Sequence, residues 1–191
     1  MARTRRRSTR SKTSPNPILQ LSVLFAFIAL VVVIAMLFQP KQSSPYEKEI
    51  REVARKYDLP ISLVKAVIRQ ESNFKEDAVS RVGAKGLMQI MPETGAYIAE
   101  KKGEDFQEEM LFDAKLNLDY GAWYLRYLLD QFENIPTSLA AYNAGPNAVK
   151  AWLEDENYSS DGKSLSSIPY PETSGYVENV MKYYESYAKK E

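Results

Sequence analysis

The 191-residue chain contains no cysteine and no histidine. Without cysteine there is no disulfide framework, no thiolate nucleophile and no zinc site built on cysteine. Without histidine, Ser-His-Asp catalysis, Cys-His catalysis and histidine-liganded metals are excluded. An enzyme of this composition must move protons with Glu, Asp, Tyr or Lys side chains.

The chain also lacks net charge, because its 25 Lys and Arg residues balance its 25 Asp and Glu residues. Residues 1–17 hold no acidic residue but six basic ones: Arg3, Arg5, Arg6, Arg7, Arg10 and Lys12. Residues 18–38 carry no charge at all. All 25 acidic residues therefore follow residue 38 together with the other 19 basic residues, so this part has a net charge of −6. The neutral total is the sum of a basic arm, an uncharged segment and an acidic domain.

Residues 18–38 predict a transmembrane helix. Only Gln20 and Ser22 are polar in this run, and at about 1.5 Å per residue it would span roughly 30 Å, the thickness of the hydrocarbon core. The basic arm at 1–17 should stay in the cytoplasm, which places the rest of the chain outside the membrane. A cleaved signal peptide is the alternative, but its apolar region is shorter and is followed by small residues at the cleavage site. An Arg-rich arm directly before an apolar run indicates topology, so we expect no nucleic-acid partner.

Residues 39–44 read as a linker to a domain at 45–191. Helix patterns dominate this domain, and they predict seven helices that begin near residues 45, 58, 92, 113, 136, 146 and 171. Alternating strand patterns are nearly absent, although 72–86 could form a small hairpin or an irregular loop. We therefore expect a mainly α domain of about seven short helices, preceded by one N-terminal transmembrane helix. We place Tyr124, Tyr127 and Tyr183 in its core.

Glu71 breaks the apolar pattern of the second predicted helix. It follows Val67 by four residues and Ile68 by three, so helical geometry places its carboxyl group on the apolar face. Desolvation there would raise the pKa of Glu71 to about 6–7, which suits a general acid. Position alone leaves open that Glu71 merely ends its helix or pairs with Arg69 or Lys75.

Two further segments hold candidate binding residues. Ser80 to Pro92 contains two glycines three residues apart and then Gln89 between apolar residues, although its apolar side chains could equally fill the core. Ala140 to Pro146 places Tyr142 and Asn143 at a predicted helix end, where Tyr142 could also be an ordinary core tyrosine.

Four motifs in order resemble the catalytic domain of the soluble lytic transglycosylases, glycoside hydrolase family 23, with a lysozyme-like fold. They are Glu71-Ser72-x-Phe74, Gly86-Leu87-Met88-Gln89-Ile90-Met91-Pro92, Ala141-Tyr142-Asn143-Ala144-Gly145 and Ile168-Pro169-Tyr170-Pro171-Glu172-Thr173-x-x-Tyr176-Val177. The resemblance covers about residues 45–188 and is here joined to a membrane anchor.

The resemblance implies that Glu71 is the catalytic acid and base and that the reaction needs no metal and no other cofactor. It further implies that the substrate is held by Ser80, Gln89, Met91, Tyr142, Asn143 and Glu172. The implied reaction cleaves the β-1,4 bond between N-acetylmuramic acid and N-acetylglucosamine in peptidoglycan and leaves 1,6-anhydro ends. A hydrolysing muramidase of the same fold and a non-catalytic, membrane-anchored wall-binding module are the alternatives.

We expect the partners to be peptidoglycan glycan strands and, through residues 18–38, the lipid bilayer. The expected form is a monomer in a bacterial cell membrane, with one span, a cytoplasmic N-terminus and an extracytoplasmic catalytic domain.

Overall fold

The computed structural model of the chain describes residue 28, residues 30 and 31, and residues 46–190. The chain divides into two compact units, residues 1–43 and residues 44–191. The predicted arm at 1–17, nearly all of the predicted span at 18–38 and the linker at 39–44 lie outside the described residues. Among the residues that are described, no helix is long and apolar enough to cross a membrane.

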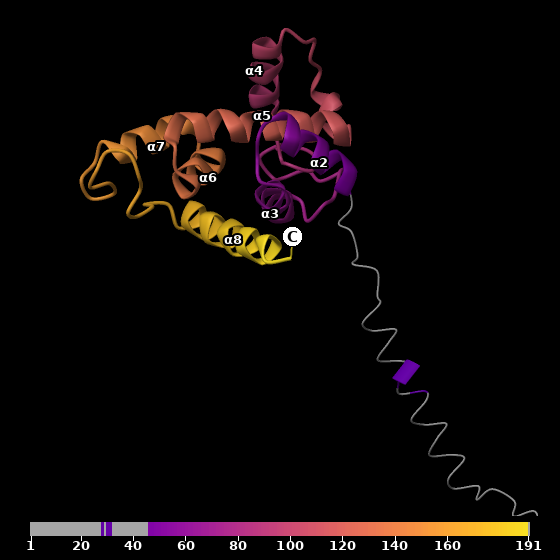
Figure 1. Cartoon of the computed structure of the whole chain (residues 1–191). Helices are drawn as coiled ribbons and strands as arrows, with labels where there is room; N and C mark the ends of the chain where they lie inside the picture. Colours follow the sequence, from indigo (N-terminus) through magenta and orange to yellow (C-terminus); the bar gives the residue numbers. More distant parts are fainter. Residues whose placement is uncertain (1–27, 29, 32–45, 191) are drawn as a thin grey trace, which may run out of the picture. The chain divides into compact units, whose positions relative to one another are not determined.

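Within the described residues, the second unit consists of seven α-helices and one short 3-10 helix, with no extended strand (Figure 1). This confirms the predicted mainly α architecture of about seven helices. The elements are α2 (Glu47–Lys56), α3 (Ile61–Glu71), α4 (Pro92–Lys102), η1 (Glu108–Phe112), α5 (Ala114–Phe132), α6 (Ile135–Ala144), α7 (Pro146–Leu153) and α8 (Pro171–Ala188).

The helices begin and end where local chemistry favours it. Proline stands in the first turn of α4, α6, α7 and α8, where its fixed φ suits a helix and its missing N–H costs nothing. The side chain of Asp113 caps α5 by accepting from the Leu116 N–H at 2.8 Å, at the helix start predicted near residue 113. Gly145, with φ 88°, ends α6 and leads directly into α7.

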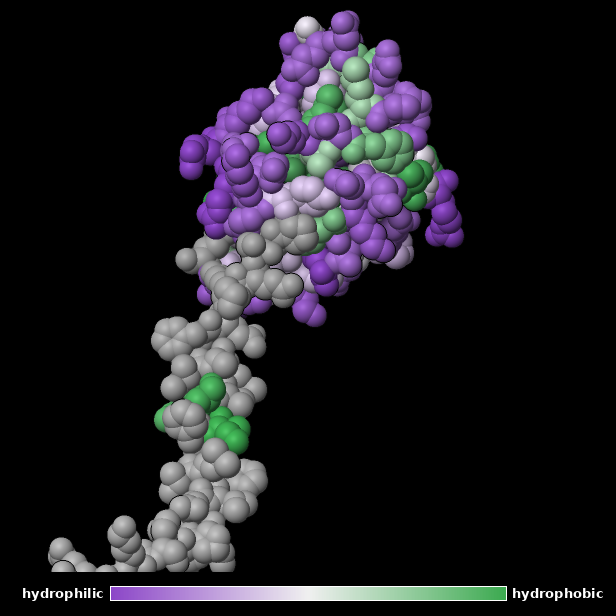
Figure 2. All heavy atoms as spheres, turned by 90° about the vertical axis from the view of Figure 1, so that its right-hand side faces the viewer, coloured by the Kyte–Doolittle hydropathy of each residue, from purple (hydrophilic) through white to green (hydrophobic). Residues whose placement is uncertain are grey.

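The longest helix, α5, runs through the unit, with α4 rising on one side of it and α8 lying on the other in Figure 1. Helix α3 packs chiefly against α8, and α5 packs against α6. Val64, Val67 and Ile68, the apolar face predicted for α3, are fully buried. The visible face in Figure 2 is mostly hydrophilic, with smaller apolar patches between polar side chains.

The loop between α3 and α4 contains a small hairpin-like turn. Isolated antiparallel bridges join Val79 to Lys85 and Lys85 to Ile90, which agrees with the predicted hairpin or irregular loop at 72–86. This loop carries most of the first two motifs, which begin at the last residue of α3 and end at the first residue of α4.

The prediction that Tyr127 lies in the core is wrong. Tyr124 and Tyr183 are partly buried against the core, whereas Tyr127 is 37% exposed. The buried face of α5 is formed by other positions: Asn117, Leu118, Tyr120, Gly121, Ala122, Leu125, Leu128, Leu129 and Phe132. Tyr127 instead lies at the edge of this face, beside Tyr97 of α4.

Candidate active site

Glu71 is the last residue of α3 and is partly buried. Burial raises the pKa of this carboxyl group from 4.5 to about 7, because desolvation disfavours the charged form. A hydrogen bond from Tyr176 opposes this increase but does not cancel it. Glu71 is therefore populated in both protonation states near neutral pH, as its place on the apolar face of the helix predicted.

Two tyrosines lie close to the Glu71 carboxyl group. The Tyr176 hydroxyl on α8 donates to Glu71 Oε1 at 2.7 Å, and the Tyr142 hydroxyl at the end of α6 donates to the Met88 carbonyl at 2.9 Å. Burial, followed by the negative charge of Glu71, raises the pKa of both phenols well above 10. Both stay neutral near pH 7, so Glu71 is the member of this group that can exchange a proton.

The loop before α4 is attached to the end of α3 by Ser72, whose hydroxyl donates to the Leu87 carbonyl at 2.8 Å. Gln89 has a left-handed backbone, and its amide donates to the carbonyls of Ala78 and Gly86 at 3.0 and 2.9 Å. The Ser80 hydroxyl accepts from the Ala84 N–H at 3.0 Å. These bonds hold the loop in shape, so Ser80 and Gln89 form part of the scaffold on which the site is built.

The side chain of Asn117 on α5 binds the same loop through hydrogen bonds. Its side chain is fully buried, accepts from the Met88 N–H at 2.7 Å and donates to the Lys85 and Leu111 carbonyls at 2.9 and 2.8 Å. Gly86, with φ 77°, lies so close that an added Cβ would collide with the Asn117 amide. Asn117 therefore sets the position of Met88, whose carbonyl in turn holds Tyr142.

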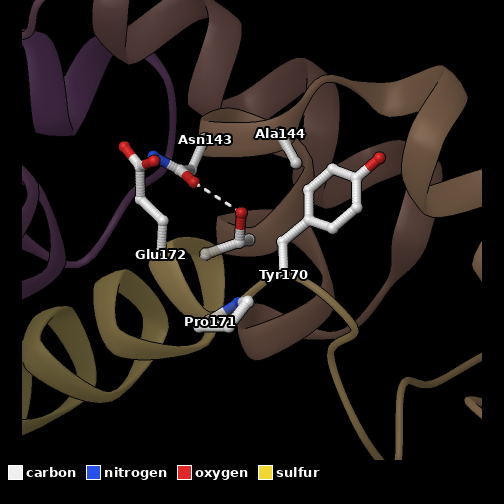
Figure 3. Close-up of a pocket in the computed structure, with 6 residues that line it drawn as sticks. Asn143, Ala144, Tyr170, Pro171 and Glu172 are labelled. Carbon is white, nitrogen blue, oxygen red and sulfur yellow. Dashed lines mark hydrogen bonds between the residues drawn. The ribbon is translucent and has the colours of Figure 1, made fainter.

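A pocket of about 340 Å³ opens where α6 meets α8 (Figure 3). It is lined by Asn143, Ala144, Tyr170, Pro171, Glu172 and Thr173. The Thr173 hydroxyl donates to Asn143 Oδ1 at 2.7 Å, and the side chains of Glu172 and Asn143 point toward one another in Figure 3. Glu172 is exposed in the first turn of α8, one helical turn before Tyr176, so α8 connects this pocket to Glu71.

The structure thus places six of the seven predicted site residues in three groups. Glu71 and Tyr142 lie near one another, Asn143 and Glu172 line one pocket, and Ser80 and Gln89 hold the loop. Met91, partly buried, is the residue that precedes α4. Within the described part of the chain, no cluster of acidic side chains suited to a metal ion occurs.

Sequence reasoning missed Tyr176, Thr173 and Asn117 as parts of this site. Tyr176 and Thr173 stand in the fourth motif, and Tyr176 follows Glu172 by one helical turn, which was a usable signal. Asn117 is a polar residue on an apolar helix face, the same break in pattern that singled out Glu71. Apart from Leu111, which precedes Asn117 by six positions, their partners lie 29 or more positions away, so these contacts could not be read from the sequence.

Comparison with known proteins yields a consistent set of similarities. Residues 48–165 match the model of the family described as "Transglycosylase SLT domain". The chain is 40% identical over 131 residues to the soluble lytic murein transglycosylase of Escherichia coli K12, which covers 66% of this chain and 20% of that protein. It is 36% identical over 120 residues to the membrane-bound lytic murein transglycosylase C of Actinobacillus pleuropneumoniae serotype 5b, which covers 57% of this chain and 33% of that protein.

The fold is likewise similar to a solved structure, the lytic transglycosylase Slt of Pseudomonas aeruginosa in an inactive mutant form. The TM-score is 0.68 at 32% identity, and the match covers 90% of this chain and 29% of that one. The chain thus spans between about a fifth and a third of the length of these relatives. The helical unit described above corresponds to one part of a larger protein in each case.

Proposed function

This chain belongs to the transglycosylase SLT domain family, and on that premise we propose that it is a peptidoglycan lytic transglycosylase with a lysozyme-like catalytic domain at 45–191. The observation that carries the proposal is the Glu71 carboxyl group, whose pKa burial raises to about 7. A carboxylic acid that holds a proton near neutral pH can deliver it to a leaving oxygen. The two buried tyrosines beside it have pKa values well above 10, so they keep their protons at this pH.

The proposed reaction uses Glu71 twice. The protonated acid first gives its proton to the glycosidic oxygen between N-acetylmuramic acid and N-acetylglucosamine, while the C1–O bond breaks and the substrate's own N-acetyl group stabilises the cationic centre. The Glu71 carboxylate then takes the proton from the muramic acid 6-hydroxyl as that oxygen bonds to C1. The attack is intramolecular and gains from high effective molarity. The products are an N-acetylglucosamine hydroxyl and a 1,6-anhydro end, and Glu71 is protonated again.

The neighbouring phenols suit this scheme. Tyr176 donates to one Glu71 oxygen and so orients the carboxyl group, while leaving its other oxygen for the substrate. Because both tyrosines remain neutral, neither competes for the proton. In this proposal Glu71 works without the second carboxylate that most glycosidases place beside the scissile bond.

Substrate binding is proposed around the same group. Asn143 and Glu172 present an amide and a carboxylate to the pocket at the α6–α8 junction, where sugar hydroxyls and amides would find partners. Tyr142 and Met91 would contact the sugars closest to Glu71. Ser80 and Gln89 would hold the loop that borders the substrate. Their oxygen atoms would also accept hydrogen bonds from the substrate.

The product distinguishes a transglycosylase from a muramidase of the same fold. Purified full-length chain is expected to release muropeptides whose muramic acid ends are 1,6-anhydro, because the intramolecular hydroxyl attacks faster than water. Mass spectrometry of digested peptidoglycan measures this directly, since a hydrolysed end is heavier by one water. Hydrated ends alone would assign the chain to the muramidases, and binding without release of soluble fragments would assign it to wall-binding modules.

We propose in addition that residues 18–38 anchor the chain in a bacterial cell membrane as a monomer, with 1–17 in the cytoplasm and 39–44 as a linker to an external catalytic domain. The uncharged run of 21 residues and the six basic residues before it support this topology. A relative named as membrane-bound has a matching domain.

Fractionation tests the anchor. The full chain is expected in the membrane pellet after a high-salt wash, because apolar insertion does not depend on salt. Protease added to spheroplasts should degrade the catalytic domain and leave an N-terminal tag intact. Recovery of the chain as a soluble, shortened form would instead identify residues 18–38 as a cleaved signal.

A further inference from the structure

Three aromatic side chains form a continuous surface on α4 and α5, which we call the aromatic ridge: Tyr97, Trp123 and Tyr127. The Trp123 and Tyr127 rings are nearly parallel, at an interplanar angle of 4° and a centroid distance of 5.5 Å. Tyr97 meets both rings edge-on, at 6.4 Å and 6.2 Å. Tyr127 is 37% exposed, and the other two are partly buried. The ridge therefore presents aromatic surface to the solvent.

The ridge is continuous with the candidate active site. Tyr124 lies 6.2 Å from Tyr127 by ring centroids and 5.6 Å from Tyr142. Tyr142 in turn lies close enough to Glu71 for the carboxylate charge to act on its hydroxyl. An unbroken series of rings thus leads from the surface of α4 and α5 to the proposed catalytic acid.

Core packing accounts for only part of the ridge. Tyr97 and Trp123 pack partly against the core, whereas Tyr127 lies outside it and is exposed. Exposed apolar groups gathered in one place mark binding surfaces more often than isolated ones do. The rings are also held in place, because they stand on two regular helices and contact one another. Aromatic side chains lose little conformational entropy when they bind, so such a surface is preorganised.

The chemistry of the ridge fits a carbohydrate. A sugar ring offers C–H groups on its faces and hydroxyl groups around its edge, and a tyrosine or tryptophan ring offers a flat apolar face with a polar group at its rim. The Lys101 ammonium lies 5.3 Å from the Tyr97 ring centroid and adds a positive charge beside the ridge. This charge would complement the carboxylates carried by wall glycans.

We propose that the aromatic ridge is an auxiliary binding surface for the uncleaved part of a glycan strand, which it guides along Tyr124 and Tyr142 toward Glu71. The proposal rests on the proposed function, since it names a further part of the substrate that the same site would bind. The ridge binds sugar units beyond those next to the scissile bond. It therefore favours long strands over short fragments.

Binding measurements test the ridge independently of cleavage. The full chain carrying Glu71→Gln, in detergent micelles, is mixed either with peptide-free glycan strands or with the N-acetylglucosamine–N-acetylmuramic acid disaccharide. Adding Tyr97→Ala or Tyr127→Ala is expected to weaken binding of long strands by roughly three- to ten-fold, and to weaken disaccharide binding much less. Trp123, one of two tryptophans in the chain, should change its fluorescence with long strands, and Trp123→Phe should remove that change.

Tyr183→Ala is the matched control. Tyr183 is also a partly buried tyrosine, but its ring lies against the Arg69 guanidinium at 5.9 Å and not in the ring series. This variant should bind long strands as the parent does. Equal affinity of the ridge variants and the parent for long strands would overturn the proposal. The proposal would also be overturned if the ridge variants lost only the binding of lipid vesicles, which would assign the ridge to contact with a bilayer. A loss of self-association alone would assign the ridge to contact with a second copy of the chain.

The two proposals fail in different ways. If wild-type chain releases no anhydro ends, the proposed reaction is wrong, whereas the dependence of strand binding on Tyr97 and Tyr127 is still measured. If anhydro ends are released but the ridge variants bind long strands normally, the ridge alone is refuted.

Discussion

Glu71→Gln is expected to reduce peptidoglycan cleavage by about 10²- to 10⁴-fold, the range associated with loss of general acid–base catalysis. Glutamine keeps the shape of the side chain and can still accept a hydrogen bond from Tyr176, but its amide is not acidic enough to transfer a proton to the glycosidic oxygen. The measurement is release of soluble muropeptides by purified full-length chain. In the wild type, turnover should fall as the pH rises above about 7, where Glu71 loses its proton. Wild-type turnover in Glu71→Gln would refute the assignment.

The same substitution should stabilise the fold at high pH. The pKa of Glu71 is about 7 in the folded chain against an ordinary value of 4.5, so the folded state binds the proton more tightly than the unfolded state does. The contribution of the protonated Glu71 carboxyl group to the free energy of unfolding is therefore fully present below pH 4.5, and it is lost as the pH rises through 7. Because glutamine does not ionise, Glu71→Gln should be more stable than the wild type by about 2–3 kcal/mol at pH 8.

Urea unfolding at pH 4 and at pH 8 checks this expectation and serves as the folding control for the activity assay. The two proteins should have similar free energies of unfolding at pH 4 and separate at pH 8. If the two proteins have the same free energy of unfolding at pH 8 as well as at pH 4, the Glu71 carboxyl group is not desolvated. The chemical argument for its role would then fail as well.

Asn117→Ala is expected to lower the free energy of unfolding by about 3 kcal/mol or more, because it removes three hydrogen bonds at a fully buried position. The Met88 N–H and the Leu111 carbonyl would lose the partner that Asn117 provides inside the domain. Activity should fall too, since Met88 would no longer be held where its carbonyl accepts from Tyr142. Chemical denaturation together with muropeptide release measures both effects.

Asn147→Ala is the control for this prediction. Asn147 lies exposed on α7, so its replacement should change the free energy of unfolding by less than about 0.5 kcal/mol. Asn117→Asp should not rescue the protein, because a carboxylate keeps the acceptor but loses both donor bonds and adds a buried charge. If Asn117→Ala unfolds like the wild type, the loop before α4 does not depend on this side chain.

The helices of this protein could be predicted because their causes are local. Prolines in first turns, the Asp113 cap and Gly145 act within a few residues, and the helices from α4 to α8 begin or end where these signals stand. The raised pKa of Glu71 could be anticipated for the same reason. A carboxyl group three and four residues after buried apolar side chains must share their face of the helix.

Other features follow from contacts between distant segments. Glu71 and Tyr176 are separated by 105 positions, and Thr173 bonds to Asn143 across 30. The bonds of Asn117 reach loop segments that periodicity cannot assign to it. Tyr127 was predicted to lie in the core, but in the folded domain its ring is exposed and lies beside Tyr97 of α4.

By itself, the sequence determined that proton transfer must depend on residues other than histidine and cysteine, that the domain is helical, and that one glutamate lies on an apolar face. Periodicity, capping and composition are enough for these conclusions, since each depends on neighbours along the chain. Only the tertiary structure decided which side chains surround Glu71, what holds the loop beside it, and which tyrosines remain exposed. The physical reason is that desolvation, hydrogen bonding and exposure at the site arise where α3, α5, α6 and α8 converge.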